Sequence, residues 1–426
     1  MSRLILLLLL SPLAVSAQFV NVVLAAEADG QSAPLNPSVV INPDNPKNII
    51  VGVSPDRAFY SVDGGLVWKE KILKSAFGIY GQPALSADDK GNVFYFHVPG
   101  SVGDENWLDR ITIQKSTDKG ASWGQAVFTG LNAPKDNFRP QPAHHIKNDL
   151  LVVTWTQFDQ YNSTDTSAHS NILFSRSTSK GDKWSDAVRV NKLSGDCADG
   201  DFTAAGATPT ISIDGKIFVV WTMGGNIYLD RSYDEGRTWL KNDITIAKQI
   251  GGAAFLVPGL TRCNGLPQAL IDNSSSPFHG SLYVLWSDQR NGEDDTNIWL
   301  TRSSNRGDNW SAPIKVNQDA SEKHQFMPWM AVDQTTGILY LVYYDRRNHD
   351  DNQTDVYLAW SLDGGNKFSE VKISEAAFTP DGSKSLGEHI GLFAHKGLIV
   401  PVWTRIDNGK TKVVATVIHQ ADLIKK

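Results

Sequence analysis

Three acidic side chains have the residue type and the predicted placement that cleavage of a sugar chain would need. Asp288, Asp345 and Glu388 belong to three different copies of a repeated segment, and the repeats predict that the three copies converge on one axis. Glycoside hydrolysis usually needs one carboxylic acid as proton donor and a second carboxylate as base or nucleophile. We therefore take Asp288, Asp345 and Glu388 as the candidate catalytic residues.

Arginine and aromatic residues dominate the positions expected around these carboxylates. Arginine binds carboxylate or sulfate groups bidentately, and aromatic rings stack on sugars, so the set favours an acidic sugar as ligand. An alternative for pairs such as Asp288 with Arg290 is a structural ion pair between neighbouring repeats. The candidate substrate-binding residues are Arg139, Arg290, Arg346, Arg347, Arg405, Trp107, Trp329, His324, His389 and Gln268.

An octapeptide that occurs six times must position these residues. SVDGGLVW begins at Ser61, and related tracts begin at Ser116, Ser177, Ser232, Ser303 and Ser361, at spacings of 55, 61, 55, 71 and 58 residues. Such spacing indicates one supersecondary unit repeated along the chain. In each copy the Ser and Asp side chains can bind backbone N–H groups of a tight turn and the Gly supplies a positive φ. Because strand-like runs flank every copy, we predict that each is the tip of a β-hairpin.

A second recurrence marks the first strand of each unit. A Pro stands five residues before an Asp, Asn or His, with a seventh frame at Ile390 and His395; the prolines are Pro37, Pro83, Pro140, Pro209, Pro267 and Pro328. Each unit offers four strands, whereas the last offers three and the early FVNVVLAA run can supply the fourth. We predict an all-β protein, a β-propeller of seven four-stranded blades over residues 18–426, closed by an N-terminal strand in the last blade. Six blades are the alternative.

The connectivity of such blades predicts where a ligand binds. In an up-and-down blade the turns between strands 1 and 2 and between strands 3 and 4 lie on one face. All six hairpin tips therefore share that face, and the remaining connections lie on the opposite one. We expect ligand binding on the face opposite the hairpin tips, which we call the mouth face.

The repeated octapeptides resemble the Asp-box, or BNR, repeat of sialidase-like β-propellers, along essentially the whole chain after residue 17. Ser179 and Asn305 replace the Asp in copies three and five, and Phe368 replaces the Trp in copy six. The resemblance implies an exported glycosidase that acts on an acidic glycan. Sialidases also carry a Phe/Tyr-Arg-Ile-Pro motif ahead of the first box. Here no such motif precedes Ser61, and the nearest string, Phe138-Arg139-Pro140, lies two boxes later.

Three functions are compatible with these features. The first is a sialidase-like glycoside hydrolase that acts on an acidic glycan or glycoconjugate. The second is a non-catalytic glycan-binding or adhesion propeller, and the third is a polysaccharide lyase that acts on uronates, with His389 or a Tyr as base. We expect the protein to be a monomer.

The N-terminus predicts export. Residues 1–17 combine a basic residue, an apolar run and a small-residue exit at Val15-Ser16-Ala17, the layout of a cleaved signal peptide, so the protein should be secreted or periplasmic. A membrane anchor would need about 20 apolar residues, more than this run has. In an exported protein Cys197 and Cys263 are expected to form a disulfide, with two free thiols as the alternative.

Charge and composition exclude some partners. The chain has 40 basic and 46 acidic residues and no basic cluster, which argues against nucleic acid. We expect no cofactor and no metal. Calcium is the alternative, because oxygen ligands cluster at residues 292–297, at 348–355 and near Cys197.

Overall fold

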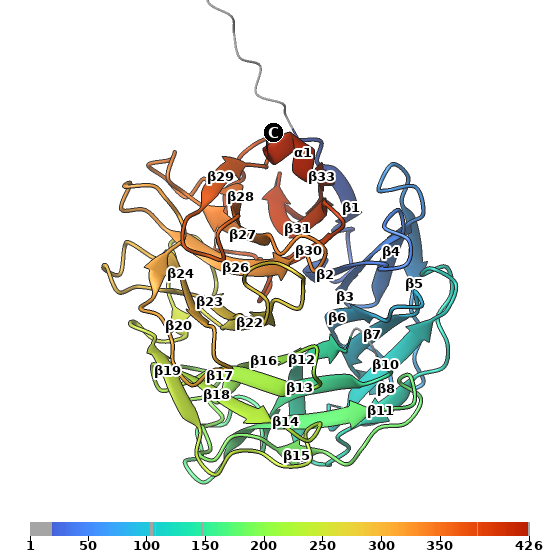
Figure 1. The fold of residues 1–426 in the computed structure, drawn as a ribbon. Coiled ribbons are helices and arrows are strands. Elements are labelled where there is room, and N and C mark those ends of the chain that lie inside the picture. The colour runs from blue at the N-terminus through green and yellow to red at the C-terminus, as the bar shows by residue number, and fades with distance from the viewer. Residues whose placement is uncertain (1–18, 103–104, 107, 146–147, 381, 425–426) are drawn as a thin grey trace, which may run out of the picture.

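The structure, a computed structural model, describes residues 19–102, 105–106, 108–145, 148–380 and 382–424 (Figure 1). Seven antiparallel sheets surround a central axis, as predicted, and the six-bladed alternative is wrong. The signal-peptide prediction falls on residues 1–17, which lie outside the described residues. The one helix found in the described part, α1 (Gln420–Leu423), has four residues, and no helix there has the length and apolar character that crossing a bilayer requires.

Each blade runs from an innermost strand beside the axis to an outermost strand at the rim. Blade one contains β2 (Leu35–Ile41), β3 (Ile49–Ser54), β4 (Arg57–Ser61) and β5 (Lys69–Ile72). Blade two contains β6 (Gly81–Ala87), β7 (Val93–Val98), β10 (Ile111–Ser116) and β11 (Val127–Thr129). Blade three contains β12 (Asp136–His144), β13 (Leu151–Phe158), β14 (Ser170–Ser177) and β15 (Val188–Arg189). Blade four contains β16 (Ala205–Ile211), β17 (Ile217–Met223), β18 (Asn226–Ser232) and β19 (Ile244–Lys248).

The remaining blades follow the same order. Blade five contains β22 (Gln268–Ile271), β23 (Leu282–Asp288), β24 (Asn297–Ser303) and β25 (Ile314–Lys315). Blade six contains β26 (Gln325–Val332), β27 (Leu339–Asp345), β28 (Asp355–Ser361) and β29 (Ser369–Lys372). Blade seven contains β30 (Gly391–His395), β31 (Leu398–Asp407) and β32 (Lys410–Ala415), with β33 (Ile418–His419) paired to β31. Two short ribbons, β8 (Ser101–Val102) with β9 (Glu105–Asn106) and β20 (Ala254–Phe255) with β21 (Cys263–Asn264), lie in the connections.

The N-terminal strand closes the ring. β1 (Val22–Ala26) pairs antiparallel with β32 and becomes the outermost strand of blade seven, as predicted. Ala25 is buried in a cluster that joins blade seven to blade one. The first and last segments of the chain therefore complete one sheet.

The hairpin tips have the predicted turn chemistry. In the first tip, Ser61 Oγ donates to Asp63 Oδ1 (2.7 Å), and the N–H of Gly65 donates to Ser61 Oγ (2.8 Å). Gly65 has φ +90°, a conformation that favours glycine. In the third tip, a Cβ on Gly181 would lie 2.8 Å from the ring of Phe94 in the preceding blade. The tips thus pack blade against blade as well as turning the chain.

The innermost strands enter the axis through a repeated irregularity. Five of them shift register near their first residues, and a residue with positive φ stands there: Asn36, Gln82, Arg139, Gly206 and Met327. In blade four the strand pairing places Ala207 rather than Pro209 in the Pro frame, and in blade seven Gly391 rather than Ile390. In blade four the predicted position is two residues too late, because the equivalent residue is Ala207 and the nearest Pro is Pro209.

The predicted disulfide is not formed. Cys197 and Cys263 are free, buried thiols. Cys197 packs with Phe138 and Phe158 of blade three, whereas Cys263 belongs to a separate cluster built around blade six. The alternative of two free thiols therefore describes the structure.

Candidate functional site

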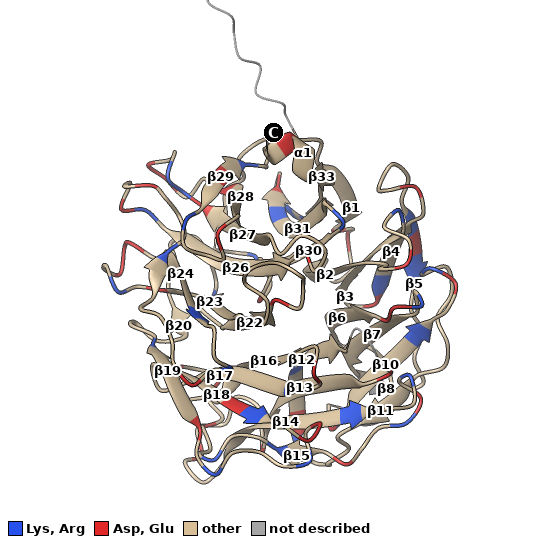
Figure 2. Ribbon diagram, in the orientation of Figure 1, with Lys and Arg blue, Asp and Glu red and all other residues tan. Residues whose placement is uncertain are grey.

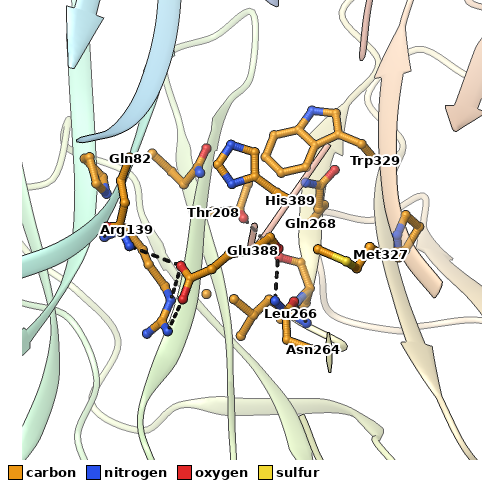
Figure 3. Close-up of a pocket in the computed structure, with 15 residues that line it drawn as sticks. Gln82, Arg139, Thr208, Asn264, Leu266, Gln268, Met327, Trp329, Glu388 and His389 are labelled. Carbon is orange, nitrogen blue, oxygen red and sulfur yellow. Dashed lines mark hydrogen bonds and ion pairs between the residues drawn. The ribbon is translucent and has the colours of Figure 1, made fainter. Parts of the chain in front are cut away.

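A pocket lies where the innermost strands begin, and Figure 3 shows the residues that line it. The hairpin tips lie at the other end of the blades, because the chain reverses direction at every turn between antiparallel strands. The side chains that shape it come from the entry of the innermost strands and from the connections between blades: Gln82, Arg139, Gln141, Thr208, Asn264, Gln268, Trp329, Glu388 and His389. We call this the mouth pocket. Its position agrees with the face that the connectivity predicted.

Charge is scarce around the axis. Figure 2 shows Lys, Arg, Asp and Glu mainly on outer strands and loops. Among the seven innermost strands, only β12 carries charged residues, Asp136 and Arg139. Arg139 is buried, and its φ of +60° is the positive value that it shares with the equivalent residues at the other irregular strand entries.

Arg139 binds two carboxylates at once. Its Nε lies 3.0 Å from Glu388 Oε2 and its Nη2 lies 2.7 Å from Glu388 Oε1, which is a bidentate contact. Its Nη1 lies 2.9 Å from Asp199 Oδ1. Burial disfavours the charged guanidinium, but the charges of Glu388 and Asp199 outweigh that effect and raise the pKa of Arg139.

Asp199 binds Arg139 and two further side chains. It accepts a hydrogen bond from Arg262 Nη1 (2.6 Å) and one from the Tyr161 hydroxyl (2.8 Å). Burial alone would raise the pKa of Asp199, but Arg139 and Arg262 hold it well below its usual range. Burial and the Asp199 charge raise the pKa of Tyr161 to about 12, so the phenol stays protonated.

Glu388 is the one carboxylate among the described residues that line the mouth pocket. Its side chain is 21% exposed and accepts a hydrogen bond from Gln82 Nε2 (3.2 Å). Its backbone N–H donates to Asn36 Oδ1 (2.7 Å), and its carbonyl accepts from Asn264 Nδ2 (2.9 Å). Glu388 is therefore held through both its side chain and its backbone.

His389 and Trp329 form the aromatic part of the pocket. Their rings lie 5.1 Å apart between centroids at an interplanar angle of 33° (Figure 3). Burial lowers the pKa of His389 to about 4, so the imidazole is neutral at pH 7. Beside them, Gln268 Oε1 accepts from the N–H of Met330 (3.0 Å), which leaves its Nε2 amide to donate to a ligand.

Two candidate catalytic carboxylates do not line the mouth pocket. Asp288 is fully buried and accepts from Trp286 Nε1 (2.8 Å) and Arg290 Nη2 (2.6 Å). Asp345 is also fully buried and pairs with Arg347 Nη2 (2.7 Å). Burial raises the pKa of Asp345 to about 6, against the lowering effect of Arg347. Both carboxylates pair with an Arg two residues later in the same blade. These are ion pairs within one blade, not the ion pairs between neighbouring repeats that were the structural alternative.

The other predicted binding residues are divided between the pocket and the blades. Arg139, Trp329, His389 and Gln268 line the pocket. Five lie elsewhere. Arg290 lies over the Trp299 ring, Arg347 forms an ion pair with Glu370, and Arg405 forms one with Asp407. Arg346 is hydrogen-bonded to Thr354 and Asn352, and His324 to Thr296. Burial lowers the pKa of Arg346 to about 10 and that of His324 to about 4. Trp107 lies outside the described residues.

Sequence reasoning missed Asp199, Arg262 and Asn264 as members of the site. Asp199 lies in the acidic tract near Cys197, which we considered only as a calcium cluster. Arg262 and Asn264 lie in the connection that contains β20 and β21. The one sequence feature that indicates this long connection is the largest spacing between repeats, 71 residues. In the described part of the chain, no three His, Cys, Asp or Glu side chains gather as a metal site would require, so the calcium alternative gains no support.

Comparison with known proteins identifies the fold. No protein-family model and no curated protein sequence matches the chain. A polysaccharide lyase described as an ulvan lyase aligns with a TM-score of 0.55 at 12% identity, over 91% of this chain and 94% of its own. The α-L-arabinofuranosidase Arb93A from Fusarium graminearum aligns at 0.52 and 16% identity, over 96% and 99% of the chains. The NanB sialidase from Streptococcus pneumoniae aligns at 0.52 and 9% identity, over 88% and 84%. At such identities the likeness establishes the propeller fold, and the relation to Asp-box proteins stays a prediction.

Proposed function

We propose that this protein is an exported carbohydrate-active propeller that binds an acidic glycan in the mouth pocket and cleaves it by β-elimination. The observation that carries the proposal is the contact of the His389 ring with Trp329, in a pocket whose one carboxylate, Glu388, is already bound by Arg139. The names of the similar structures, a lyase and two glycosidases, support a carbohydrate ligand without specifying the reaction.

The pocket favours elimination over the hydrolysis that the sequence predicted. Hydrolysis usually needs two carboxylates about 5 to 10 Å apart, one of which protonates the leaving oxygen. Here both oxygens of Glu388 are bound by Arg139, and Asp288 and Asp345 pair inside their own blades. No second carboxylate is available among the described residues that line the pocket.

Elimination needs a base and a group that stabilises the sugar carboxylate. In the proposed step the His389 imidazole removes the proton at C5 of a uronate, and the electron pair forms the C4–C5 double bond. The C4–O bond breaks, and the departing oxygen takes up the proton that the imidazolium returns. Gln141, Gln268 and Trp329 line the pocket. In the proposed complex the two side-chain amides donate to the uronate carboxylate, and the sugar stacks on the Trp329 ring.

Product analysis tests the proposal. Ulvan, alginate, pectin and hyaluronan are incubated with the protein, and both ultraviolet absorbance of unsaturated uronate and new reducing ends are measured. We expect both signals from at least one polymer, and a loss of about 100-fold or more in rate for His389→Ala. His395→Ala is the matched control, because His395 is not among the residues that line the mouth pocket and its ring contacts the carbonyl of Pro43. Reducing ends without unsaturated product would establish hydrolysis instead.

A non-catalytic lectin-like propeller is the second candidate. The ionic network of Arg139, Arg262, Asp199 and Glu388 is complete without a ligand, as a rigid binding pocket would require. Glycan binding that Trp329→Ala weakens, with neither product signal, would establish this function. Absence of both binding and cleavage on the whole panel would exclude both candidates.

A further inference from the structure

We infer that a channel along the propeller axis binds an uncharged end unit of the glycan, so that the protein takes its ligand by a chain end and not at an internal segment. This inference rests on the proposed glycan-binding function. The ligand class that it names is a glycan in which a neutral end sugar adjoins an acidic one.

The channel is a second cavity, which runs between the innermost strands that surround the axis (Figure 1). Its volume of about 450 Å³ falls in the range of about 300 to 1,000 Å³ that small-molecule sites have. We call it the axial channel. Every innermost strand contributes at least one short side chain to its wall: Ser38, Ala84, Ala143, Thr210, Ala269, Ala331 and Ala394.

The axial channel begins at the mouth pocket. At its other end it reaches the turns that follow the innermost strands, where Asp89 and Thr335 are exposed. A ligand in the mouth pocket therefore lies over an opening, and the two cavities form one path. The side chains that line both of them are Gln141, Thr208, Gln268 and Trp329.

The closed ring restricts which part of a glycan can enter the channel. Seven blades surround it, and β1 closes the last of them by pairing with β32. An internal segment of a chain would have to fold back on itself inside the channel, whereas a chain end enters without folding back. The geometry therefore favours recognition of chain ends.

The channel wall carries almost no charge. Asp89, at the end far from the mouth pocket, is the one Asp, Glu, Lys or Arg among the described residues that line it. Burial lowers the pKa of His144 and of His395, the last residues of β12 and β30, so neither imidazole is charged at pH 7. A uronate carboxylate in the channel would lose its hydration without gaining a counter-charge, which is strongly unfavourable. The unit that enters is therefore uncharged, and the acidic unit stays in the mouth pocket.

Hydroxyl groups of the wall can bind the hydroxyls of a neutral sugar. Ser38 Oγ accepts from the N–H of Leu85 (3.0 Å), and Thr210 Oγ1 accepts from the N–H of Ile271 (3.1 Å). Each contact leaves the O–H of the Ser or Thr to donate to a ligand. Most of the other side chains that line the channel are apolar. An apolar wall with a few placed polar groups is typical of small-ligand sites.

Two hyaluronan trisaccharides test the inference. One has N-acetylglucosamine at both ends and glucuronate in the middle, and the other has glucuronate at both ends. Calorimetric titration of the wild type should show that the trisaccharide with neutral ends binds at least about tenfold more tightly. The number of proteins bound per chain, measured on size-fractionated fragments of each polymer that binds, should not increase with chain length.

Variants that narrow the channel test the same site from the side of the protein. Ala143 and Ala331 line the channel but not the mouth pocket, so Ala143→Leu and Ala331→Leu should each weaken binding of the neutral-ended trisaccharide by about tenfold. Two variants in different blades are used, and melting curves confirm that each is folded. Ala421→Leu is the matched control, since Ala421 is exposed in α1 and does not line the channel.

The outcomes separate this inference from the proposed function. Equal affinity for the two trisaccharides overturns the axial site, as does binding of neither while a polymer binds. A number of bound proteins that grows with chain length, or folded Leu variants that bind as the wild type does, also overturns it. In each of these cases polymer binding that Trp329→Ala weakens still supports the mouth pocket. Absence of binding to every polymer overturns the proposed function, and the axial site with it.

Discussion

At the scale of the residue, Asp199 holds the charges of the site in place, and its removal should destabilise the fold. Its side chain is 5% exposed and faces Arg139 and Arg262. Asp199→Asn keeps the shape but leaves two guanidinium groups with Glu388 alone. We expect a loss of about 3 kcal/mol in the free energy of unfolding at pH 7, because a buried charge pair is broken from one side. Asp350→Asn, at a fully exposed carboxylate, should change it little.

The pH dependence of the same pair of variants has a defined sign. The pKa of Asp199 is lower in the folded protein than in the unfolded chain, so its charge contributes stability above the unfolded value of about 4. That contribution decreases progressively as the pH falls from this value towards the lower pKa of the folded protein. In urea unfolding, the difference between wild type and Asp199→Asn should therefore narrow from pH 7 to pH 3. A difference of equal size at both pH values would contradict the role assigned to the Asp199 charge.

At the scale of the element, closure of the ring by β1 should depend on the face of the strand that is changed. Ala25 is 3% exposed and packs between blades seven and one, whereas Val23, on the same strand, is 50% exposed. Ala25→Asp places a charge in an apolar cluster and should cost about 3 kcal/mol or more, with a clear fall in Tm. Val23→Asp should change stability by about 0.5 kcal/mol or less. Equal Tm values in circular-dichroism melts would mean that β1 does not hold the ring closed.

The elements were predictable where their signals are local. A hairpin tip needs Ser, Asp and Gly at adjacent positions, and a Pro marks the entry of most innermost strands, so strand number, order and closure could be derived from the sequence. The site was predictable only in part. Glu388, His389 and Arg139 adjoin the strand entries and reach the pocket. Whether Asp345 points to the axis or pairs with Arg347 depends on side-chain direction. The path of the connection that carries Arg262 depends on tertiary contacts. The repeat pattern contains no information on either.

At the scale of the whole molecule, strand pairing and packing between blades must hold the ring together without a covalent link. Cys197 packs in blade three and Cys263 in a cluster built around blade six, and each thiol is buried. We therefore expect a thiol reagent to modify no cysteine in the native protein. In denaturant without reductant it should modify two cysteines per chain. Reductant should leave Tm unchanged, whereas loss of a disulfide typically costs about 2 to 5 kcal/mol. Thiols that stay blocked in denaturant, together with a reductant-dependent Tm, would show that the cysteines meet and that the blades between them are arranged differently.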